Sequence, residues 1–321
     1  DGLRLEMIAT RDPKRADRAR RENPSARIIS DPAAMLREPS IDLIVIATPN
    51  QTHVPLGIAA LQAGKHAVVD KPIARTVAEA KPLLEAAESS GRILTVYQNR
   101  RWDGDFLTVQ GVVAGGELGP IDSFESRFEW YQPEIKGWRD DPAESGGPLH
   151  DLGAHLIDQA ILLFGPVHEV YAELDARRQG TLVPDSAFVS LTHDSGTRTR
   201  IWSSLSSVEL GPRFLVRGLT GEYVRYGRDV QEEQLLAGLA PGDEGWGLND
   251  QAGTIRLPGE PRSGRNVPTL PGSYERFYEG LRDAIQAGGP PPVDPLDSVA
   301  VLTVIERAME SASGARRIAA T

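Results

Sequence analysis

Short apolar runs alternate with helical patterns through the first hundred residues. Strands are expected over residues 3–9, 26–30, 41–47, 67–70 and 92–98, with helices in the intervals between them. The run from Ile41 to Ala47 is the clearest of these and is typical of a fully buried strand. Alternation of this kind builds a parallel sheet with helical crossovers. We therefore predict an α/β domain of the Rossmann type at residues 1–102.

The pattern changes after Trp102. An alternating strand is expected over residues 122–132, and a hairpin should turn at Asp194-Ser195-Gly196. A second hairpin should join residues 214–218 to 223–226, and helices near 273–287 and 295–313 should close the chain. Successive strands of this kind favour a mainly antiparallel sheet. Residues 103–321 are therefore expected to form a separate α+β domain.

Composition narrows the classes of partner. The chain has 321 residues and a net charge of -10, so it has no overall attraction for nucleic acid or for an anionic membrane. It contains no cysteine, which excludes disulfides, a thiol nucleophile and cysteine-bound zinc, and this fits a reducing compartment. No apolar run is long enough to span a membrane. We expect a cytoplasmic protein that binds a small molecule.

One stretch carries candidate chemistry, a glycine pair at Gly146-Gly147 followed by a helix with Asp151, His155 and Asp158. Spacings of four and three residues place these side chains on one face of an α-helix. An imidazole can take a proton from a hydroxyl, and a neighbouring carboxylate stabilises the resulting cation. A structural interpretation also fits, because an acid in a first helical turn favours the positive end of the helix.

The predicted strand ends supply a second set of candidates. In open parallel sheets ligands bind outside the carboxyl ends of the strands, which here carry Thr10, Thr48 to Asn50, Asp70 to Pro72, and Gln98 to Arg100. Lys71 directly follows a buried strand, and an ammonium there could polarise a carbonyl oxygen or hold a hydroxyl. An exposed lysine before a helix is the alternative.

Taken in order, three motifs resemble the glucose-fructose oxidoreductase/inositol dehydrogenase family. They are Ala47-Thr48-Pro49-Asn50 with His53, then Asp70-Lys71-Pro72, then Gly146-Gly147 with Asp151-Leu152-Gly153-Ala154-His155. The resemblance implies a dehydrogenase that moves a hydride between a nicotinamide and a carbon of a sugar or cyclic polyol. It implies that Lys71 contacts a substrate oxygen, that Asp151 contacts the substrate and that His155 is the catalytic acid/base.

The resemblance also assigns binding residues. Within the family, residues 98–107 and 136–139 are most similar to the branch of NADP-dependent scyllo-inositol dehydrogenases. The expected cofactor contacts are Thr10, Arg11, Lys14, Thr48, Pro49, Asn50, His53, Asp70, Lys71, Pro72, Gln98 and Asn99, and the expected substrate contacts are Arg100, Trp102, Trp138, Arg139 and His150. Asp70 stands where many members have glutamate, and His150 stands where tyrosine is common in the branch. The resemblance favours a homodimer or homotetramer in which residues 103–321 bind substrate and mediate association.

The choice of cofactor follows from the end of the first predicted strand. NAD-dependent enzymes commonly place an acid there to accept the ribose hydroxyls, whereas a ribose phosphate needs cations. We expect Asp12 to cap the following helix, which leaves Thr10, Arg11 and Lys14 to meet a phosphate. The turn predicts NADP over NAD, and a solvated basic turn is the alternative.

The glycine-rich turn that approaches a pyrophosphate in this fold has no counterpart in the sequence. We expect a longer encoded protein, because the strand that precedes this turn normally lies in the middle of the sheet. Without it, backbone groups on both neighbouring strands would be exposed.

Two other functions remain open at this stage. A non-catalytic protein that senses nucleotide or sugar could keep the fold without turnover. A metal enzyme could use His150, Asp151, His155 and Asp158, but adjacent helical residues point to different sides and no distant ligand cluster is evident. We predict no metal site.

Overall fold

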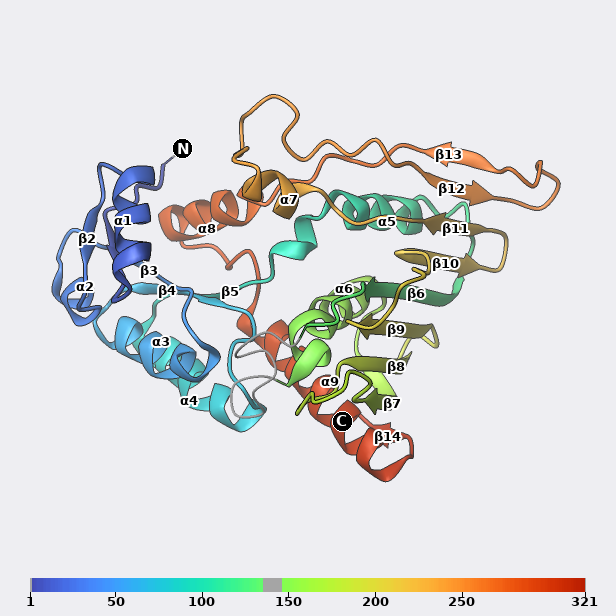
Figure 1. Ribbon diagram of the computed structural model, residues 1–321, viewed down its shortest axis with the longest axis horizontal. Helices are drawn as coiled ribbons and strands as arrows, with labels where there is room; N and C mark the ends of the chain where they lie inside the picture. Colours follow the sequence, from blue (N-terminus) through green and yellow to red (C-terminus); the bar gives the residue numbers. More distant parts are fainter. Residues whose placement is uncertain (1, 135–145, 321) are drawn as a thin grey trace. The chain divides into compact units, whose positions relative to one another are not determined.

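The structure, a computed structural model, describes residues 2–134 and 146–320. It divides into two compact units (Figure 1). The first contains residues 1–97 and 277–296, and the second contains residues 98–276 and 297–321. The sequence had suggested a single break between residues 102 and 103, but a helix near the C-terminus belongs with the first unit.

The first unit consists of short parallel strands with helices between them. Its elements are β1 (Met7–Ala9), α1 (Pro13–Glu22), β2 (Arg27–Ile29), α2 (Ala33–Arg37), β3 (Leu43–Ile46), η1 (Asn50–Thr52), α3 (His53–Gln62), β4 (His66–Asp70), α4 (Val77–Ser90), β5 (Leu94–Tyr97) and most of α8 (Glu275–Ala287). β1 pairs with β2, and a separate sheet has the order β3-β4-β5. All three pairings are parallel, as predicted.

Two expectations for this unit need correction. The first strand begins at Met7 and not at Leu3, because its partner β2 begins opposite Met7. The strand predicted to be buried on both faces, β3, has Val45 48% exposed. Val45 alternates with the buried Ile44 and Ile46, so one face of β3 is open. Among the described strands β3 also pairs only with β4 and therefore forms an edge.

The second unit is built on one nine-stranded sheet. Its elements are η2 (Asn99–Trp102), α5 (Gly104–Gly115), β6 (Ile121–Glu129), η4 (Leu149–Gly153), α6 (Ala154–Phe164), β7 (Val167–Asp175), β8 (Ser186–His193), β9 (Arg198–Ser204), β10 (Phe214–Gly218), β11 (Glu222–Arg225), α7 (Gln231–Leu236), β12 (Gly253–Arg256), β13 (Arg265–Val267), most of α9 (Pro295–Gly314) and β14 (Ile318–Ala319). The strand order is β13-β12-β11-β10-β6-β9-β8-β7-β14.

Every pairing in this sheet is antiparallel except that of β6 with β9, which confirms the predicted class. Both predicted hairpins form, β8 to β9 and β10 to β11. Alternate strand residues join side chains of α5, α6 and α9 in one apolar core, which includes Phe124 of β6, Leu156 of α6 and Ile305 of α9. This core fixes α6, the helix that carries His155.

Candidate active site

Turns at the ends of β3 and β4 carry the predicted site residues of the first unit. After β3, the hydroxyl of Thr52 donates to the carbonyl of Pro49 at 2.7 Å, which closes the turn around Asn50. After β4, the amide of Lys71 donates to the carboxylate of Asp70 at 2.8 Å, and the Lys71-Pro72 peptide is cis. Lys71 itself is half-buried. Both turns lie at the carboxyl ends of neighbouring parallel strands, as the sequence predicted.

A cavity of about 450 Å³ lies beside the turn that follows β1. Thr10 and Arg11 line it, and Lys14 is not among its lining residues. Its two acids are engaged by backbone amides, since Asp12 accepts from the amides of Lys14 and Arg15 at 2.8 and 3.3 Å. Asp31 accepts from Ala33 at 3.0 Å. The predicted helix cap at Asp12 is therefore confirmed.

Two residues of this unit, which were not assigned to the site from the sequence, lie near predicted site residues. Arg20 lines the cavity beside β1, one turn of α1 after Ala16, which also lines it. Tyr278 of α8 packs against Tyr97 at the end of β5 with a centroid distance of 5.6 Å. Burial, together with the charge of Asp70, raises the pKa of the Tyr278 hydroxyl to about 12. The regular spacing of α1 could have indicated Arg20, but nothing local could have placed Tyr278 near β5.

In the second unit the glycine pair shapes the approach to α6. A side chain on Gly147, which has a φ of 70°, would meet the carbonyl of Pro184 at 2.2 Å. A Cβ on Gly146 would meet the ring of His150, whose Nδ1 lies 3.2 Å from the Gly146 carbonyl oxygen. Position 147 therefore requires glycine, whereas a side chain on Gly146 would force the His150 ring to move. Burial lowers the pKa of His150.

The helix itself is not uniform. Residues Leu149–Gly153 form a π-helical turn, and α6 starts at Ala154. Asp151 lies in the wider turn and is half-buried, whereas His155 lies in the α-helix and is 5% exposed. The predicted common face of Asp151 and His155 requires an α-helix throughout, which this turn interrupts. π-turns within α-helices occur frequently at functional sites.

Asp158 has a structural partner. Arg101 contacts it with two parallel hydrogen bonds, Nε to Oδ2 at 2.8 Å and Nη2 to Oδ1 at 2.6 Å. Nη2 also donates to Asp297 at 2.9 Å. One residue further along α6, the side-chain Nε2 of Gln159 donates to the carbonyl of Arg100 at 2.9 Å. These contacts attach η2 to the helix that carries His155, and no local pattern in the sequence indicated this role of Arg101.

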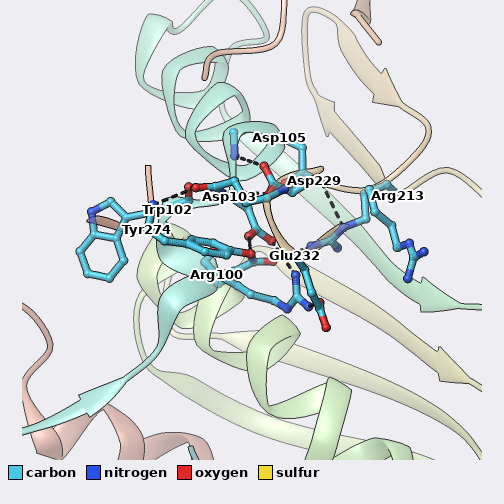
Figure 2. A network of polar contacts seen from close by, with 12 residues as sticks. Arg100, Trp102, Asp103, Asp105, Arg213, Asp229, Glu232 and Tyr274 are labelled. Carbon is cyan, nitrogen blue, oxygen red and sulfur yellow. Dashed lines mark hydrogen bonds and ion pairs between the residues drawn. The ribbon is translucent and has the colours of Figure 1, made fainter. Parts of the chain in front are cut away.

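A buried polar network surrounds the start of α5 (Figure 2). The Tyr274 hydroxyl donates to Asp103 at 2.8 Å, and Arg100 lies 3.4 Å from the same carboxylate. Arg100 also donates to Glu232 at 2.6 Å. The Arg100 side chain, predicted to bind substrate, is therefore engaged with two carboxylates and only 16% exposed.

The network continues through Asp229 and Arg213 (Figure 2). Asp229 accepts the amide of Gly104 at 2.7 Å, at the first turn of α5. The guanidinium of Arg213 lies 3.4 Å from Asp105 and donates to the side chain of Gln159 at 3.2 Å. Since Gln159 is on α6, the network joins the start of α5 to the candidate catalytic helix.

Burial governs the ionisation of this network. It raises the pKa of Asp103 to about 8, although the charge of Arg100 opposes the rise. Burial also raises the pKa of Asp229 and lowers that of Arg213 to about 10. The pKa of Tyr274 is raised, first by burial and then by the charge of Asp103. Burial therefore favours the protonated form of the Asp103 carboxyl.

The predicted site residues fall in both units. The strand-end residues from Thr10 to Pro72 belong to the first unit, whereas Gln98, Asn99, Arg100, Trp102, His150, Asp151 and His155 belong to the second. Trp138 and Arg139 lie outside the described residues. Within residues 2–134 and 146–320, no cluster of three or more histidine or acidic side chains could hold a metal ion.

Comparison with known proteins identifies the family. The description "Oxidoreductase family, NAD-binding Rossmann fold" matches residues 1–98, and "Oxidoreductase family, C-terminal alpha/beta domain" matches residues 111–319. The chain belongs to this family of glucose-fructose oxidoreductases and inositol dehydrogenases. It is therefore an oxidoreductase with an NAD-binding Rossmann domain, as the motifs had suggested.

Individual members of the family are similar over nearly the whole chain. Escherichia coli YdgJ, named as an uncharacterized oxidoreductase, is 38% identical over 97% of this chain and 89% of its own length. Bacillus subtilis IolW, named as an NADP-dependent scyllo-inositol 2-dehydrogenase, is 34% identical over 99% of this chain and 89% of its own length.

Solved structures show the same fold. The Bacillus subtilis protein YvaA is 31% identical and matches with a TM-score of 0.93, over 99% of this chain and 91% of that one. An oxidoreductase from Bacillus cereus is 29% identical with a TM-score of 0.85, over 95% and 88% of the two chains. In the described part of this family member, no helix has the length and apolar character needed to cross a membrane.

Proposed function

We propose that this oxidoreductase is an NADP-dependent dehydrogenase that acts on a CH-OH group of a cyclic polyol or sugar of the inositol type. Membership of the family supports the hydride chemistry, and the relative IolW supports the substrate class. The observation that carries the proposal is local to the second unit. A half-buried carboxylate, Asp151, lies in a π-helical turn four residues before a buried imidazole, His155, on a helix fixed by the core.

During oxidation the protein must accept the proton of the reacting hydroxyl group. In the proposed mechanism His155 takes this proton during oxidation and returns it during reduction, and Asp151 orients the substrate and stabilises the charged ring. The ammonium of Lys71 is proposed to contact a substrate oxygen and to stabilise negative charge that develops on it. The nicotinamide, when bound, supplies the hydride acceptor. Asp158 has no chemical role, because it is held by Arg101.

NADP is the proposed cofactor because of the residues beside β1. Arg11 presents an exposed guanidinium at the cavity there, and Thr10 adds a hydroxyl. Both groups suit a ribose phosphate. The cavity's carboxylates, Asp12 and Asp31, are engaged by backbone amides, which disfavours their use as acceptors for the free ribose hydroxyls of NAD. Lys14 stays a prediction as a further cation.

The remaining residue assignments are proposals on the same basis. Trp102, His150, Trp138 and Arg139 would contact the polyol, and Arg100 would do so only through the part of its side chain not bound by Asp103 and Glu232. Cofactor contacts are proposed for Thr48, Pro49, Asn50, Asp70, Pro72, Gln98 and Asn99. We also propose that the protein acts as a homodimer or homotetramer.

A substrate panel tests the function. Purified protein is assayed with inositols and aldoses, each with NADP and with NAD, beside His155→Ala and His193→Ala as a matched buried histidine of the same unit. We expect turnover with an inositol and NADP, loss of at least about 100-fold in kcat for His155→Ala, and near wild-type kcat for His193→Ala. Nucleotide binding without turnover of any pair would favour the sensing protein instead.

A further inference from the structure

Arg178 connects two stretches of chain at one end of the nine-stranded sheet. It lies between β7 and β8, and its side chain is only 8% exposed. Its Nε donates to the carboxylate of Asp185 at 2.9 Å. Its Nη1 donates to the carbonyl oxygens of Glu134 and Gln132, which follow β6, at 3.0 and 3.4 Å. The guanidinium therefore links the β7–β8 loop to a separate stretch of backbone.

Asp185 holds the same loop from its other end. Its side chain is fully buried, and its carboxylate accepts the backbone amides of Arg177 and Arg178 at 2.8 and 2.7 Å. Burial favours a higher pKa for Asp185, but the two amides and the Arg178 guanidinium outweigh burial and lower the pKa. Asp185 is therefore a buried carboxylate whose charge is compensated by Arg178.

The residue before Asp185 contacts the glycine pair. A Cβ on Gly147 would lie 2.2 Å from the carbonyl oxygen of Pro184 and 3.8 Å from a methyl group of Val183, so the two stretches of backbone pack closely. Gly147 leads into the π-helical turn Leu149–Gly153, which carries Asp151. The β7–β8 loop thus supports the approach to this turn.

The neighbouring Arg177 provides a contrast. Its guanidinium donates to Asp175 at 2.9 Å, but the two side chains are 60% and 53% exposed. An exposed pair of this kind contributes little to stability. Removing a guanidinium from water is costly unless its donors find acceptors, and Arg178 is the buried member of this adjacent pair. Only the buried arginine joins the loop to the chain after β6 among the contacts described for these two residues.

We propose that Arg178 is a positioning residue for substrate binding. Through Asp185 it holds Pro184 against Gly147, and through backbone carbonyls it anchors this loop to the chain after β6. Its effect on the substrate passes through the turn that carries Asp151. The inference rests on the proposed function, in which Asp151 orients the polyol.

Hydrogen exchange followed by mass spectrometry tests the positioning without any substrate. Arg178→Leu removes the guanidinium but keeps the backbone amide that Asp185 accepts. Arg177→Leu is the matched control, because it removes the exposed neighbour and also keeps its amide. Residues 146–153 should exchange about tenfold faster in Arg178→Leu than in wild type, and at the wild-type rate in Arg177→Leu. Equal rates in all three proteins would overturn the positioning role.

A second variant covers a failure of Arg178→Leu to fold, since that change leaves the buried carboxylate of Asp185 without its cation. Arg178→Lys keeps a positive charge there, but an ammonium cannot reproduce the forked geometry of a guanidinium. Thermal unfolding shows which variants fold. Folded Arg178→Lys should also exchange faster at residues 146–153, and exchange at the wild-type rate would contradict the proposal.

Kinetics with a polyol identified by the substrate panel test the consequence for binding. We expect the KM for the polyol to rise about tenfold in Arg178→Leu, with a smaller fall in kcat, because Asp151 orients the substrate whereas His155 transfers the proton. The Kd for NADPH should stay near wild type, and Arg177→Leu should keep all three values. A mere loss of folded protein would lower the apparent kcat without changing KM. An unchanged KM therefore refutes the positioning role.

The two measurements separate this inference from the proposed function. If the wild-type protein turns over no polyol with either cofactor, the proposed function fails, and hydrogen exchange still decides whether Arg178 holds the turn at residues 146–153. If the wild-type protein is active and Arg178→Leu exchanges faster there but keeps its KM, the proposed function stands and the role of Arg178 in substrate binding is overturned.

Discussion

Loss of the Arg101 side chain should destabilise the second unit strongly. Arg101 and Asp158 have side chains that are only 10% and 3% exposed, and two hydrogen bonds of 2.8 and 2.6 Å join them. Burial raises the pKa of Asp158, and the hydrogen bonds from Arg101 oppose that rise. The guanidinium thus compensates a carboxylate that has lost nearly all its contact with water.

The magnitude follows from this burial. In Arg101→Leu the carboxylate of Asp158 remains buried without its cation, which typically costs about 3–5 kcal/mol of the free energy of unfolding. In Arg101→Leu/Asp158→Leu no buried charge is left over, so much of that loss should be recovered. Arg307→Leu is the matched control on α9, because Arg307 contacts Glu310 at 3.0 Å but both side chains are about 40% exposed. Its cost should be ~0–1 kcal/mol.

Urea unfolding monitored by tryptophan fluorescence gives these free energies. The reasoning would be refuted if Arg101→Leu stayed within about 1 kcal/mol of wild type, or if the double variant lost the full sum of the two single changes. The kcat of Arg101→Leu is measured under conditions in which the variant is fully folded. A lower kcat than wild type would then show that the pair also sets the position of His155.

Three further predictions follow from single sites. The pKa of Asp103 is about 8 in the folded state against an ordinary 3.8, so the folded state binds this proton more tightly than the unfolded state. The free energy of unfolding should therefore fall as the pH rises from about 4 to about 8. In urea titrations at several pH values, Asp103→Asn should show a weaker pH dependence than wild type. Gly104→Ala should lower the free energy of unfolding by about 1–3 kcal/mol, because its Cβ would lie 2.2 Å from the carbonyl oxygen of Leu270. The control is Gly111→Ala on the same helix, whose Cβ would meet nothing within 4 Å and which should be neutral or stabilising. Arg11→Ala should raise the KM for NADP about tenfold and leave that for NAD unchanged; equal effects on both cofactors would contradict a phosphate contact.

Local signals in the sequence were sufficient for most elements. Asp12 followed by Pro13 marked the start of α1 because a helix cap depends only on amides two and three residues away. The hairpin at Gly196 was predictable because its turn requires a positive φ, which is 85° here. Short-range periodicity was sufficient to place Lys71 at the end of a strand and His155 on a helix.

Other features depended on packing between distant parts of the chain. Arg101 meets Asp158 across 57 positions and Tyr274 meets Asp103 across 171, and no periodicity connects residues so far apart. The π-helical turn before α6 could not be predicted from the sequence either, because its residues are equally compatible with an ordinary α-helix.

The sequence by itself determined which residue types stand at the strand ends and on the candidate helix, since those choices depend on near neighbours along the chain. Tertiary structure decided which of them are held by side chains or backbone groups from another element. The sequence alone could not show how Asp158, Arg100 and His53 are held, because each is engaged by partners from another element. Burial makes an unsatisfied polar group costly, so packing fixes such side chains in structural contacts.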